Sequence, residues 1–579
     1  MKQKVNCVIF ILLLLTSCAR NEVVYIVQTS DVHGLVFPYD FITGEENSSS
    51  LSHVQSFTAS LRKHYPVLLL DNGDILQGQP VIYYSNYIDT TRQHVLAGMM
   101  NYMQYDAGTV GNHDIEAGPA VYKRLLREFS FPWLAANAVK RKTGEPYFKP
   151  YAMVQKGSLR IAVLGLTTVS VTHWLPENLW QEMRFQDMED AAREWVEKIR
   201  TNEHPDLMIG LFHSGFGGPQ GDQTYNHTEN TAYSIAVNVP GFDIIFCGHD
   251  HRELDTLLLN SAGEKVLVLN PGSHARNVAL VEIRKTTTEN RQNTLSLTGE
   301  IVDTRHFTSD RTFKRTFNDY FVKAKEYTEQ PVGELAIALD SREALFGPSS
   351  FTDLVHQVQL DITGADISFT APLSIDARLP KGIVRVKDLF ALYRYENSLF
   401  TMRLTGKEIV NYLEYSYGRW FSTMKNEDDY LLLYRTRQDG NPVVSYRSGA
   451  YILRYPSYNF DSARGIHYTV DVSKKPGNRI TVQSLANGNA FDENKTYSVA
   501  VNSYRGSGGG GHLEEGAGLS GETRKMRIIS STGRDLRTDM MDWFRSKESI
   551  NPQYVPCWKV IPAEWVEKAK KREYPLLFK

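Results

Sequence analysis

Five short motifs of metal-ligating residue types are spread over the first half of the chain. They are Asp31-Val32-His33-Gly34, Gly73-Asp74, Gly111-Asn112-His113-Asp114, His213-Ser214-Gly215 and Gly248-His249-Asp250-His251. Carboxylate, imidazole and carboxamide groups are ligands for divalent ions such as Zn, Mn or Fe. The glycines allow the backbone to turn sharply beside an ion. One tetrahedral ion cannot use this many acids and imidazoles. They therefore predict two ions ~3.5–4 Å apart, bridged by one carboxylate.

The elements that must position these motifs are visible as apolar runs. The runs are residues 23–27, 67–70, 161–166, 207–212 and 244–247. Continuous β-rich runs of this length predict strands buried on both faces. Amphipathic stretches at 51–65 and 188–200 predict helices between them, which indicates a layered α/β fold. Because ligands of open α/β sheets bind at the carboxyl ends of strands, we expect the motifs to converge on one rim.

Length and composition indicate two large globular domains. The chain has 579 residues, of which 42% are hydrophobic and 22% are charged. A domain usually has ~100–200 residues, so each of the two can bury a full core. The formal net charge of −2 gives no indication of binding to a nucleic acid polymer. Oligomeric state is left open.

The pattern predicts these domains at definite positions. We expect a layered α/β domain at 23–305, a linking helix at 306–330, an α+β domain at 331–547 and a tail at 548–579. Aromatic residues at helical spacing, from Phe313 to Phe321, indicate the linking helix. Thr405 and Glu408 have the spacing of a capping box, which predicts a helix from there to Tyr417. The sequence assigns no role to the tail.

The first seventeen residues are predicted to be a signal peptide. Lys2 and Lys4 are followed by an apolar run at 8–15, the size of a signal-peptide core. Residues 15–18 resemble a bacterial lipobox, which implies cleavage and lipidation at Cys18. We therefore expect a chain secreted across the inner membrane and lipid-anchored in the envelope, facing the periplasm or the cell exterior. Cys247 and Cys557 are predicted to be buried as small hydrophobic residues.

The order of the five motifs resembles the calcineurin-like metallophosphoesterases, in the subgroup fused to a 5′-nucleotidase-type C-terminal domain. The resemblance covers essentially the whole mature chain, and it implies a sheet sandwich flanked by helices. It also implies seven metal ligands in two sets joined by a bridging carboxylate. They are Asp31, His33 and His251 for one ion, Asn112, His213 and His249 for the other, and Asp74 between them. Two such ions would lower the pKa of a shared water and neutralise phosphate oxygens.

The resemblance also implies a catalytic histidine that is not a ligand. His113 matches it, and would protonate the leaving ribose oxygen or stabilise the transition state. Such a histidine needs an acceptor on its second ring nitrogen. Related enzymes often place Asp or Asn three positions further on. Here that position is Glu116, one methylene longer than Asp, and we predict it in the orienting role.

Two branches of the family differ in the second domain. The branch that cleaves 5′-nucleotides and UDP-sugars has an N-G-G-x-R-type loop, whereas the equivalent residues 370–376 read Thr-Ala-Pro-Leu-Ser-Ile-Asp. Residues 392–397, 458–461, 465–468 and 502–510 instead resemble the 2′,3′-cyclic phosphodiesterase/3′-nucleotidase branch. In that branch two tyrosines sandwich the base, and Tyr458 and Tyr504 match them. Arg505, Gly508 and Gly509 are predicted as further substrate contacts.

These patterns predict hydrolysis of 2′,3′-cyclic nucleotides and 3′-nucleotides to nucleoside and phosphate. The closest alternative is a 5′-nucleotidase or UDP-sugar hydrolase. An alternative of another class is a non-catalytic nucleotide-binding lipoprotein, against which the intact ligand set argues. The sequence leaves open which metals are loaded and which base is preferred.

Overall fold

The computed structural model describes residues 20–219, 229–287, 293–445, 448–552 and 556–578. The predicted signal peptide and its lipidated Cys18 lie outside these residues. Within these ranges, no helix is both long and apolar enough to cross a membrane. Cys247 is buried and Cys557 is half-buried, and both are free thiols.

Two six-stranded sheets form the first domain. The first has the order β14-β13-β1-β2-β3-β4, and the second has the order β11-β12-β10-β9-β7-β6. The strands of the first are β1 Arg20–Thr29, β2 Val67–Asp71, β3 Ala107–Thr109, β4 Trp133–Leu134, β13 Asn277–Thr287 and β14 Asn293–Asp303. Those of the second are β6 Tyr151–Lys156, β7 Leu159–Thr167, β9 Leu207–His213, β10 Ile244–Cys247, β11 Glu253–Leu259 and β12 Lys265–Pro271. All five apolar runs lie in strands, as predicted.

The sheets pack face to face, and helices cover their outer faces. Apolar side chains of β1 and β2 meet those of β9 and β10 in one buried cluster that contains Ile26, Leu70, Leu211 and Phe246. The helices are α1 Leu51–Arg62, α3 Val95–Tyr102 and α5 Pro119–Glu128 against the first sheet, and α8 Met188–Glu203 and α9 Ala232–Asn238 against the second. The layered α/β prediction is confirmed, and α1 and α8 are the predicted helices.

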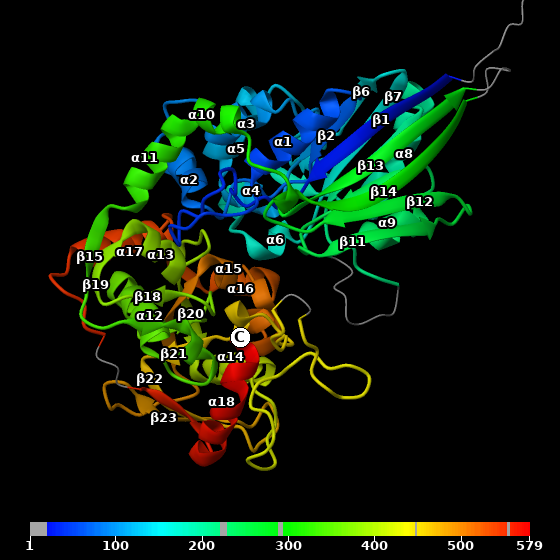
Figure 1. The fold of residues 1–579 in the computed structure, drawn as a ribbon. Helices are drawn as coiled ribbons and strands as arrows, with labels where there is room; N and C mark the ends of the chain where they lie inside the picture. Colours follow the sequence, from blue (N-terminus) through cyan, green and yellow to red (C-terminus); the bar gives the residue numbers. More distant parts are fainter. Residues whose placement is uncertain (1–19, 220–228, 288–292, 446–447, 553–555, 579) are drawn as a thin grey trace, which may run out of the picture.

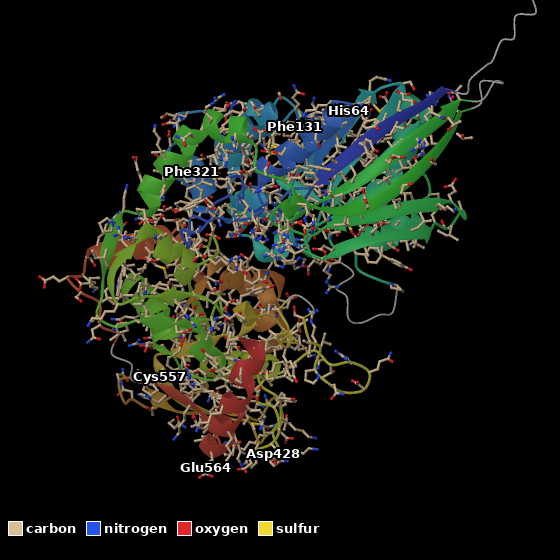
Figure 2. All side chains as sticks on the ribbon, viewed as in Figure 1. His64, Phe131, Phe321, Asp428, Cys557 and Glu564 are labelled. Atoms are coloured by element: carbon tan, nitrogen blue, oxygen red, sulfur yellow. The ribbon has the colours of Figure 1, made fainter. Side chains whose placement is uncertain are left out.

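A helical linker connects this sandwich to the second domain (Figure 1). It consists of α10 Arg311–Thr316 and α11 Asn318–Thr328. Phe321, labelled in Figure 2, anchors α11 on the first domain, with ring centroids 5.3 Å from Phe37, 5.2 Å from Tyr39 and 5.3 Å from Phe41. These ring contacts, two of them edge-to-face and one tilted, hold α11 against the sandwich.

The second domain is α+β. A five-stranded sheet has the order β21-β17-β24-β20-β25, and a smaller sheet has the order β23-β22-β26. The strands are β17 Ile367–Thr370, β20 Leu399–Thr405, β21 Ser462–Arg464, β22 Ile466–Asp471, β23 Ile480–Leu485, β24 Thr496–Asn502, β25 Ile528–Ser531 and β26 Trp558–Ile561. The main helices are α12 Ser350–Thr363, α13 Val386–Leu392, α14 Gly406–Trp420 and α17 Leu536–Arg545. Thr405 and Glu408 form the predicted capping box at the start of α14.

The tail is part of this second domain. Strand β26 pairs in parallel with β22, and helix α18 (Ala563–Leu577) packs beside it. The carboxylate of Glu573 is fully buried and accepts hydrogen bonds from the backbone N–H groups of Leu431 (2.7 Å) and Leu432 (3.0 Å) and from the Tyr434 hydroxyl (2.9 Å). The second domain therefore extends past the predicted boundary at residue 547, because residues of the tail pack into its core.

Glu573→Ala should destabilise the second domain. It leaves three donors without an acceptor in a buried place, and such losses cost about 1–3 kcal/mol each, so we expect a decrease of at least about 2 kcal/mol in unfolding free energy. Glu567→Ala, on the exposed face of the same helix, is the matched control and should change stability little. Urea unfolding measures both. Equal stability of the two variants would show that the tail is dispensable.

Candidate metal centre

The predicted ligands converge on one end of the sandwich. Asp31 and His33 follow β1, Asp74 follows β2, and Asn112 and His113 open helix α4 (Asn112–Glu116) after β3. From the second sheet, His213 ends β9, and His249 and His251 follow β10. The donor atoms of Asp31, His33 and His251 lie within 4.8 Å of one another, as do those of Asp74, His213 and His249. The two sheets thus contribute to a single rim, as the motif order predicts.

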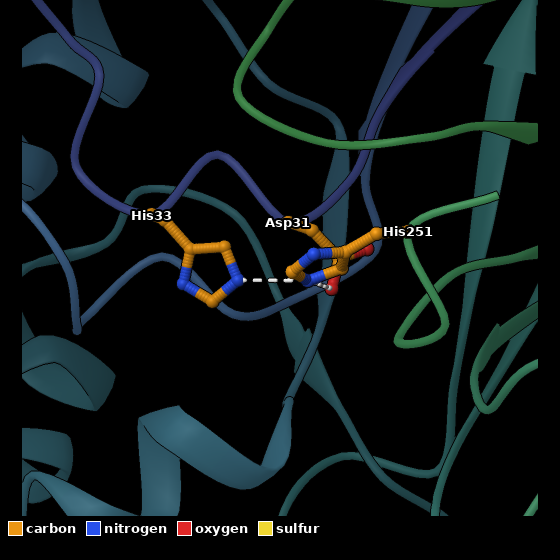
Figure 3. Close-up of side chains that lie close together, drawn as sticks. All are labelled: Asp31, His33 and His251. Atoms are coloured by element: carbon orange, nitrogen blue, oxygen red, sulfur yellow. Dashed lines mark hydrogen bonds and ion pairs between the residues drawn. The ribbon is translucent and has the colours of Figure 1, made fainter. Parts of the chain in front are cut away.

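The first cluster places acceptor atoms against one another (Figure 3). Nε2 of His33 lies 3.1 Å from Nε2 of His251, which lies 3.4 Å from Oδ1 of Asp31. Nδ1 of His33 faces the carbonyl oxygen of Gln77 at 3.3 Å, so it carries the proton and leaves a lone pair on Nε2. Burial, and then the charge of His251, lowers the pKa of His33 to about 3, although Asp74 opposes the shift. A neutral His33 is the form that ligates metals.

The second cluster is built in the same way. Nδ1 of His213 donates to the carbonyl oxygen of Asn72 at 2.7 Å, which directs the lone pair of Nε2 at Oδ2 of Asp74 (3.2 Å) and Oδ1 of Asn112 (3.1 Å). Nε2 of His249 donates to Glu229 at 2.8 Å. The indole of Trp174 stacks on the His249 ring at a centroid distance of 5.4 Å.

This donor chemistry fits divalent cations. A lone-pair nitrogen that faces a carboxylate oxygen at 3.2 Å gains nothing unless a proton or a cation lies between them. Burial opposes protonation of His213, but Asp74 outweighs it and raises the pKa to about 9, so this site concentrates negative potential. Imidazole nitrogens with carboxylate and amide oxygens suit Zn, Mn or Fe. Asp74 reaches both clusters electrostatically, which supports the predicted bridging position.

The backbone is strained where it delivers these ligands. The φ angles are positive at five of the predicted ligands: Asp31 (49°), His33 (47°), Asp74 (57°), His249 (68°) and His251 (57°). This conformation costs roughly 1–2 kcal/mol for a residue with a side chain. Strain of this kind concentrates at functional sites. Space is also short, because a Cβ on Gly111 would lie 2.2 Å from Oδ1 of Asp74.

Asp114 holds the strained loops in place, a role that the sequence did not indicate. Its buried carboxylate accepts hydrogen bonds from four backbone N–H groups, which belong to Asp74 (3.0 Å), Ile75 (2.9 Å), Leu76 (3.0 Å) and Gly111 (2.7 Å). Those bonds couple the loop after β2 to the loop after β3. The fixed loop geometry offsets part of the strain.

His274 is a further histidine of the site that sequence reasoning missed. Its ring centroid lies 5.5 Å from that of His33 and 5.9 Å from that of His251. It follows strand β12, and its φ of 65° is positive like those of the ligands. The signal was present, because Gly272-Ser273-His274 comes after an apolar run just as the five motifs do.

His113 stands beside the clusters and contacts Glu116. Its backbone N–H donates to Oδ1 of Asp74 at 2.9 Å, and its Nδ1 is hydrogen-bonded to the Glu116 carboxylate, as the predicted orienting role requires. Burial lowers the pKa of His113, but the charges of Asp74 and Glu116 outweigh burial and raise it to about 10. The ring centroid lies 5.5 Å from that of His33, and the second ring nitrogen of His113 has no hydrogen-bond partner among the described residues.

Tyr458 and Tyr504 meet at the face of the second domain that borders the metal clusters. Both are half-buried, and Glu229, which binds His249, also acts on the raised pKa values of both tyrosines, behind burial as the main cause. Helix α15 (Ser503–Gly506), which carries Tyr504, contacts α6 (Val171–Trp174), which carries Trp174. The predicted base-binding tyrosines are therefore brought to the metal site.

Arg505 differs from its predicted role as a substrate contact. The guanidinium is buried and all five of its N–H donors are used, on Asp461, Asn459 and the carbonyl oxygens of Tyr458 and Gly509. No donor remains for a substrate. Arg505 instead ties the backbone of Tyr458 to the helix that carries Tyr504.

The glycine run supports the same two tyrosines. A Cβ on Gly509 would lie 2.5 Å from the Tyr504 ring, and a Cβ on Gly508 would lie 2.5 Å from the Arg524 guanidinium. These close approaches to the protein's own side chains explain why both positions are glycine. A contact of Gly508 or Gly509 with substrate stays a prediction.

Residues 24–253 match the calcineurin-like phosphoesterase family and residues 327–515 match the 5′-nucleotidase C-terminal domain. A 2′,3′-cyclic-nucleotide 2′-phosphodiesterase/3′-nucleotidase of Haemophilus influenzae is 23% identical over 617 residues, which span 94% of this chain and 89% of that protein. The trifunctional nucleotide phosphoesterase protein YfkN of Bacillus subtilis is 24% identical over 613 residues, and the match spans 94% of this chain but 39% of YfkN.

A solved structure shares the fold. A Staphylococcus aureus chain, provisionally named a 5′-nucleotidase, superimposes with a TM-score of 0.75 at 22% sequence identity. The superposition covers 93% of this chain and 100% of that chain. It shows that both domains, and their connection, follow a known architecture.

Asp74→Asn should empty the metal centre while keeping the fold. The amide removes the charge that both clusters share, so we expect the metal content of the purified protein to fall from about two ions per chain to one or none. Asp255→Asn, on the exposed edge strand β11, is the matched control. Elemental analysis measures the ions, and circular dichroism checks the fold. Unchanged metal content in Asp74→Asn would rule out the bridging position.

Proposed function

Since the chain belongs to the calcineurin-like phosphoesterases that carry a 5′-nucleotidase C-terminal domain, hydrolases of phosphoesters, we propose that it cleaves 2′,3′-cyclic nucleotides and 3′-nucleotides to nucleoside and phosphate. The observation that carries the proposal is the position of the tyrosine pair. The helix of Tyr504 contacts α6, whose Trp174 stacks on His249 of the metal centre, and Arg505 joins that helix to the backbone of Tyr458. A base held between the tyrosines would have its phosphate within reach of the clusters.

The two clusters are proposed to hold two divalent ions. When bound, the ions would supply an activated water and neutralise charge on the phosphate oxygens. Asp31, His33 and His251 would hold one, and Asn112, His213 and His249 the other, with Asp74 shared. The leaving ribose oxygen needs a proton, and the free nitrogen of His113 is placed to donate it. Glu116 stabilises the imidazolium before the transfer and fixes the ring afterwards.

The tyrosine faces bind the base without reading its edge. Stacking on an aromatic ring recognises any π surface, so several bases should be accepted. Tyr395 lies against Tyr458 at a centroid distance of 5.9 Å and extends the aromatic wall. Arg505 fixes the distance between the loops of Tyr458 and Tyr504. We further propose that the protein works outside the cytoplasm on a lipid anchor at Cys18, which rests on the sequence of residues 1–18.

A substrate comparison tests the proposal. The metal-loaded protein should turn over 2′,3′-cAMP and 3′-AMP with higher kcat/KM than 5′-AMP or UDP-glucose. A preference for 5′-AMP or UDP-glucose would instead support the 5′-nucleotidase alternative. Binding of all these compounds without turnover would identify a non-catalytic nucleotide-binding protein.

His113→Ala should retain both metals but slow turnover of 3′-AMP by ~10²–10⁴-fold, the usual size of an acid–base contribution. The loss should be smaller for p-nitrophenyl esters, because their leaving group needs little protonation. Glu116→Gln keeps the ring in place through an amide acceptor and should cost less than His113→Ala. Equal losses for nucleoside and p-nitrophenyl leaving groups would argue against the acid role of His113.

Tyr504→Ala should lower kcat/KM for 3′-AMP by ~5–150-fold, because stacking on one aromatic face is worth ~1–3 kcal/mol. Bis(p-nitrophenyl) phosphate has no nucleobase and should be almost unaffected. Tyr504→Phe retains the ring and serves as the control. Tyr458→Ala should show the same contrast. If both substrates lose equally, the tyrosines are packing residues; if neither loses, the base binds elsewhere.

A further inference from the structure

One short segment of the second domain meets the metal centre, the tyrosines and the domain interface. Residues 393–398 connect α13 to β20. Tyr395 lies against Tyr458. Glu396 forms an ion pair with Arg537 of the second domain (3.1 Å) and accepts a hydrogen bond from Tyr87 of the first domain (3.1 Å). Asn397 is buried and accepts from the backbone N–H of Tyr504 at 3.2 Å. The three residues that follow Arg394 are therefore fixed by contacts with both domains.

A single residue, Gln77, connects the backbone of Arg394 to the first metal cluster. The backbone carbonyl of Arg394 accepts a hydrogen bond from the side chain of Gln77 (3.3 Å), whose own carbonyl faces Nδ1 of His33 (3.3 Å). Arg394 belongs to the second domain, but its backbone is bonded to a first-domain residue that contacts a predicted metal ligand.

The guanidinium of Arg394 is available for a ligand. It is exposed, and it makes no hydrogen bond or ion pair with any residue that the structure describes. Two neighbouring arginines of the second domain are engaged: Arg505 uses all five donors, and Arg537 is buried in ion pairs with Glu396 and Asp535. The loop at 370–376, which could have supplied a cation, contains none. An anion at the metal centre would therefore meet one free cation from this segment.

We propose that Arg394 is a catalytic residue that binds the substrate's phosphoryl group from the side opposite the metal clusters. The proposal rests on the phosphoesterase function proposed above. A guanidinium presents parallel N–H donors that match two phosphate oxygens, and it stays charged at all working pH values. It would contact the oxygens that the metal centre leaves free and stabilise the charge that builds up on them. Because Tyr395 follows directly, the same segment would set the distance between the phosphate and the base.

The test compares Arg394→Ala and Arg394→Lys with Arg378→Ala. Arg378 is an exposed arginine of the same domain, paired with Asp340 at 3.2 Å, and is the matched control. Two quantities are measured on the metal-loaded proteins: kcat/KM for 3′-AMP, and the dissociation constant of inorganic phosphate from calorimetry. Arg394→Ala should lower kcat/KM by ~10²-fold, as loss of one charged transition-state donor does. It should also weaken phosphate binding at least ~10-fold, a 1.4 kcal/mol loss.

Arg394→Lys keeps the charge and should lie between wild type and Arg394→Ala in both measurements. Arg378→Ala and the metal content of all variants should equal those of wild type. Wild-type phosphate affinity in Arg394→Ala would overturn the proposal, whatever the turnover. If wild type hydrolyses no phosphoester, the proposed function fails, and phosphate binding still decides: loss of binding in Arg394→Ala supports the anion site, and equal binding overturns it. Should Arg394→Ala fail to fold, Arg394→Lys against wild type gives the same decision.

Discussion

The crowding of acceptor atoms at one rim of the sandwich constrains the rest of the structure. Lone-pair nitrogens and carboxylate oxygens lie within 4.8 Å of one another in each cluster. Like partial charges at this distance repel in a buried place, so the arrangement is unfavourable until protons or cations occupy it. The chain must therefore force the geometry, and it does so with left-handed backbone at Asp31 and His33, whose φ angles are 49° and 47°. Stability is reduced at this rim and recovered in the cores around it.

Ordinary packing and hydrogen bonds hold the ligands in this unfavourable geometry. Parallel strands of two sheets end at the same level because their apolar faces interlock in one dry core. The carboxylate of Asp114 accepts hydrogen bonds from backbone N–H groups of two neighbouring loops. It therefore positions these loops and does not act as a ligand for an ion. Carbonyl oxygens of Asn72 and Gln77 select the tautomers of His213 and His33. None of these contacts involves a proposed substrate-binding group, yet the geometry of the predicted ligands depends on all of them.

How much the sequence could predict follows from the range of each interaction. Strand ends and the motifs that follow them are local, so the fold class, the rim and the approach of the seven predicted ligands to one another could be predicted. Arg505 could not be judged this way, because its partner Asp461 is 44 residues away and only the fold shows that its donors are used. The tail is similar: its pairing with β22 spans about ninety residues, and no local pattern indicates it. The role of a side chain cannot be predicted from local sequence when its partners are distant in the chain.

The division of the site between two domains makes their relative position part of the chemistry. Tyr83 and Tyr87 of the first domain contact Thr538 and Glu396 of the second, at 2.7 and 3.1 Å. Burial raises the pKa of Glu396 to about 7, although Arg537 opposes the shift, so this contact contributes little net stability. Its directed bonds nevertheless allow one alignment of the domains. In the proposed mode of binding, stacking on the tyrosines would accept any base, whereas the fixed distance from the metal clusters to those tyrosines would accept only one position of the phosphate. Selection among nucleotide isomers would then come from the domain contact, and base tolerance from the aromatic faces.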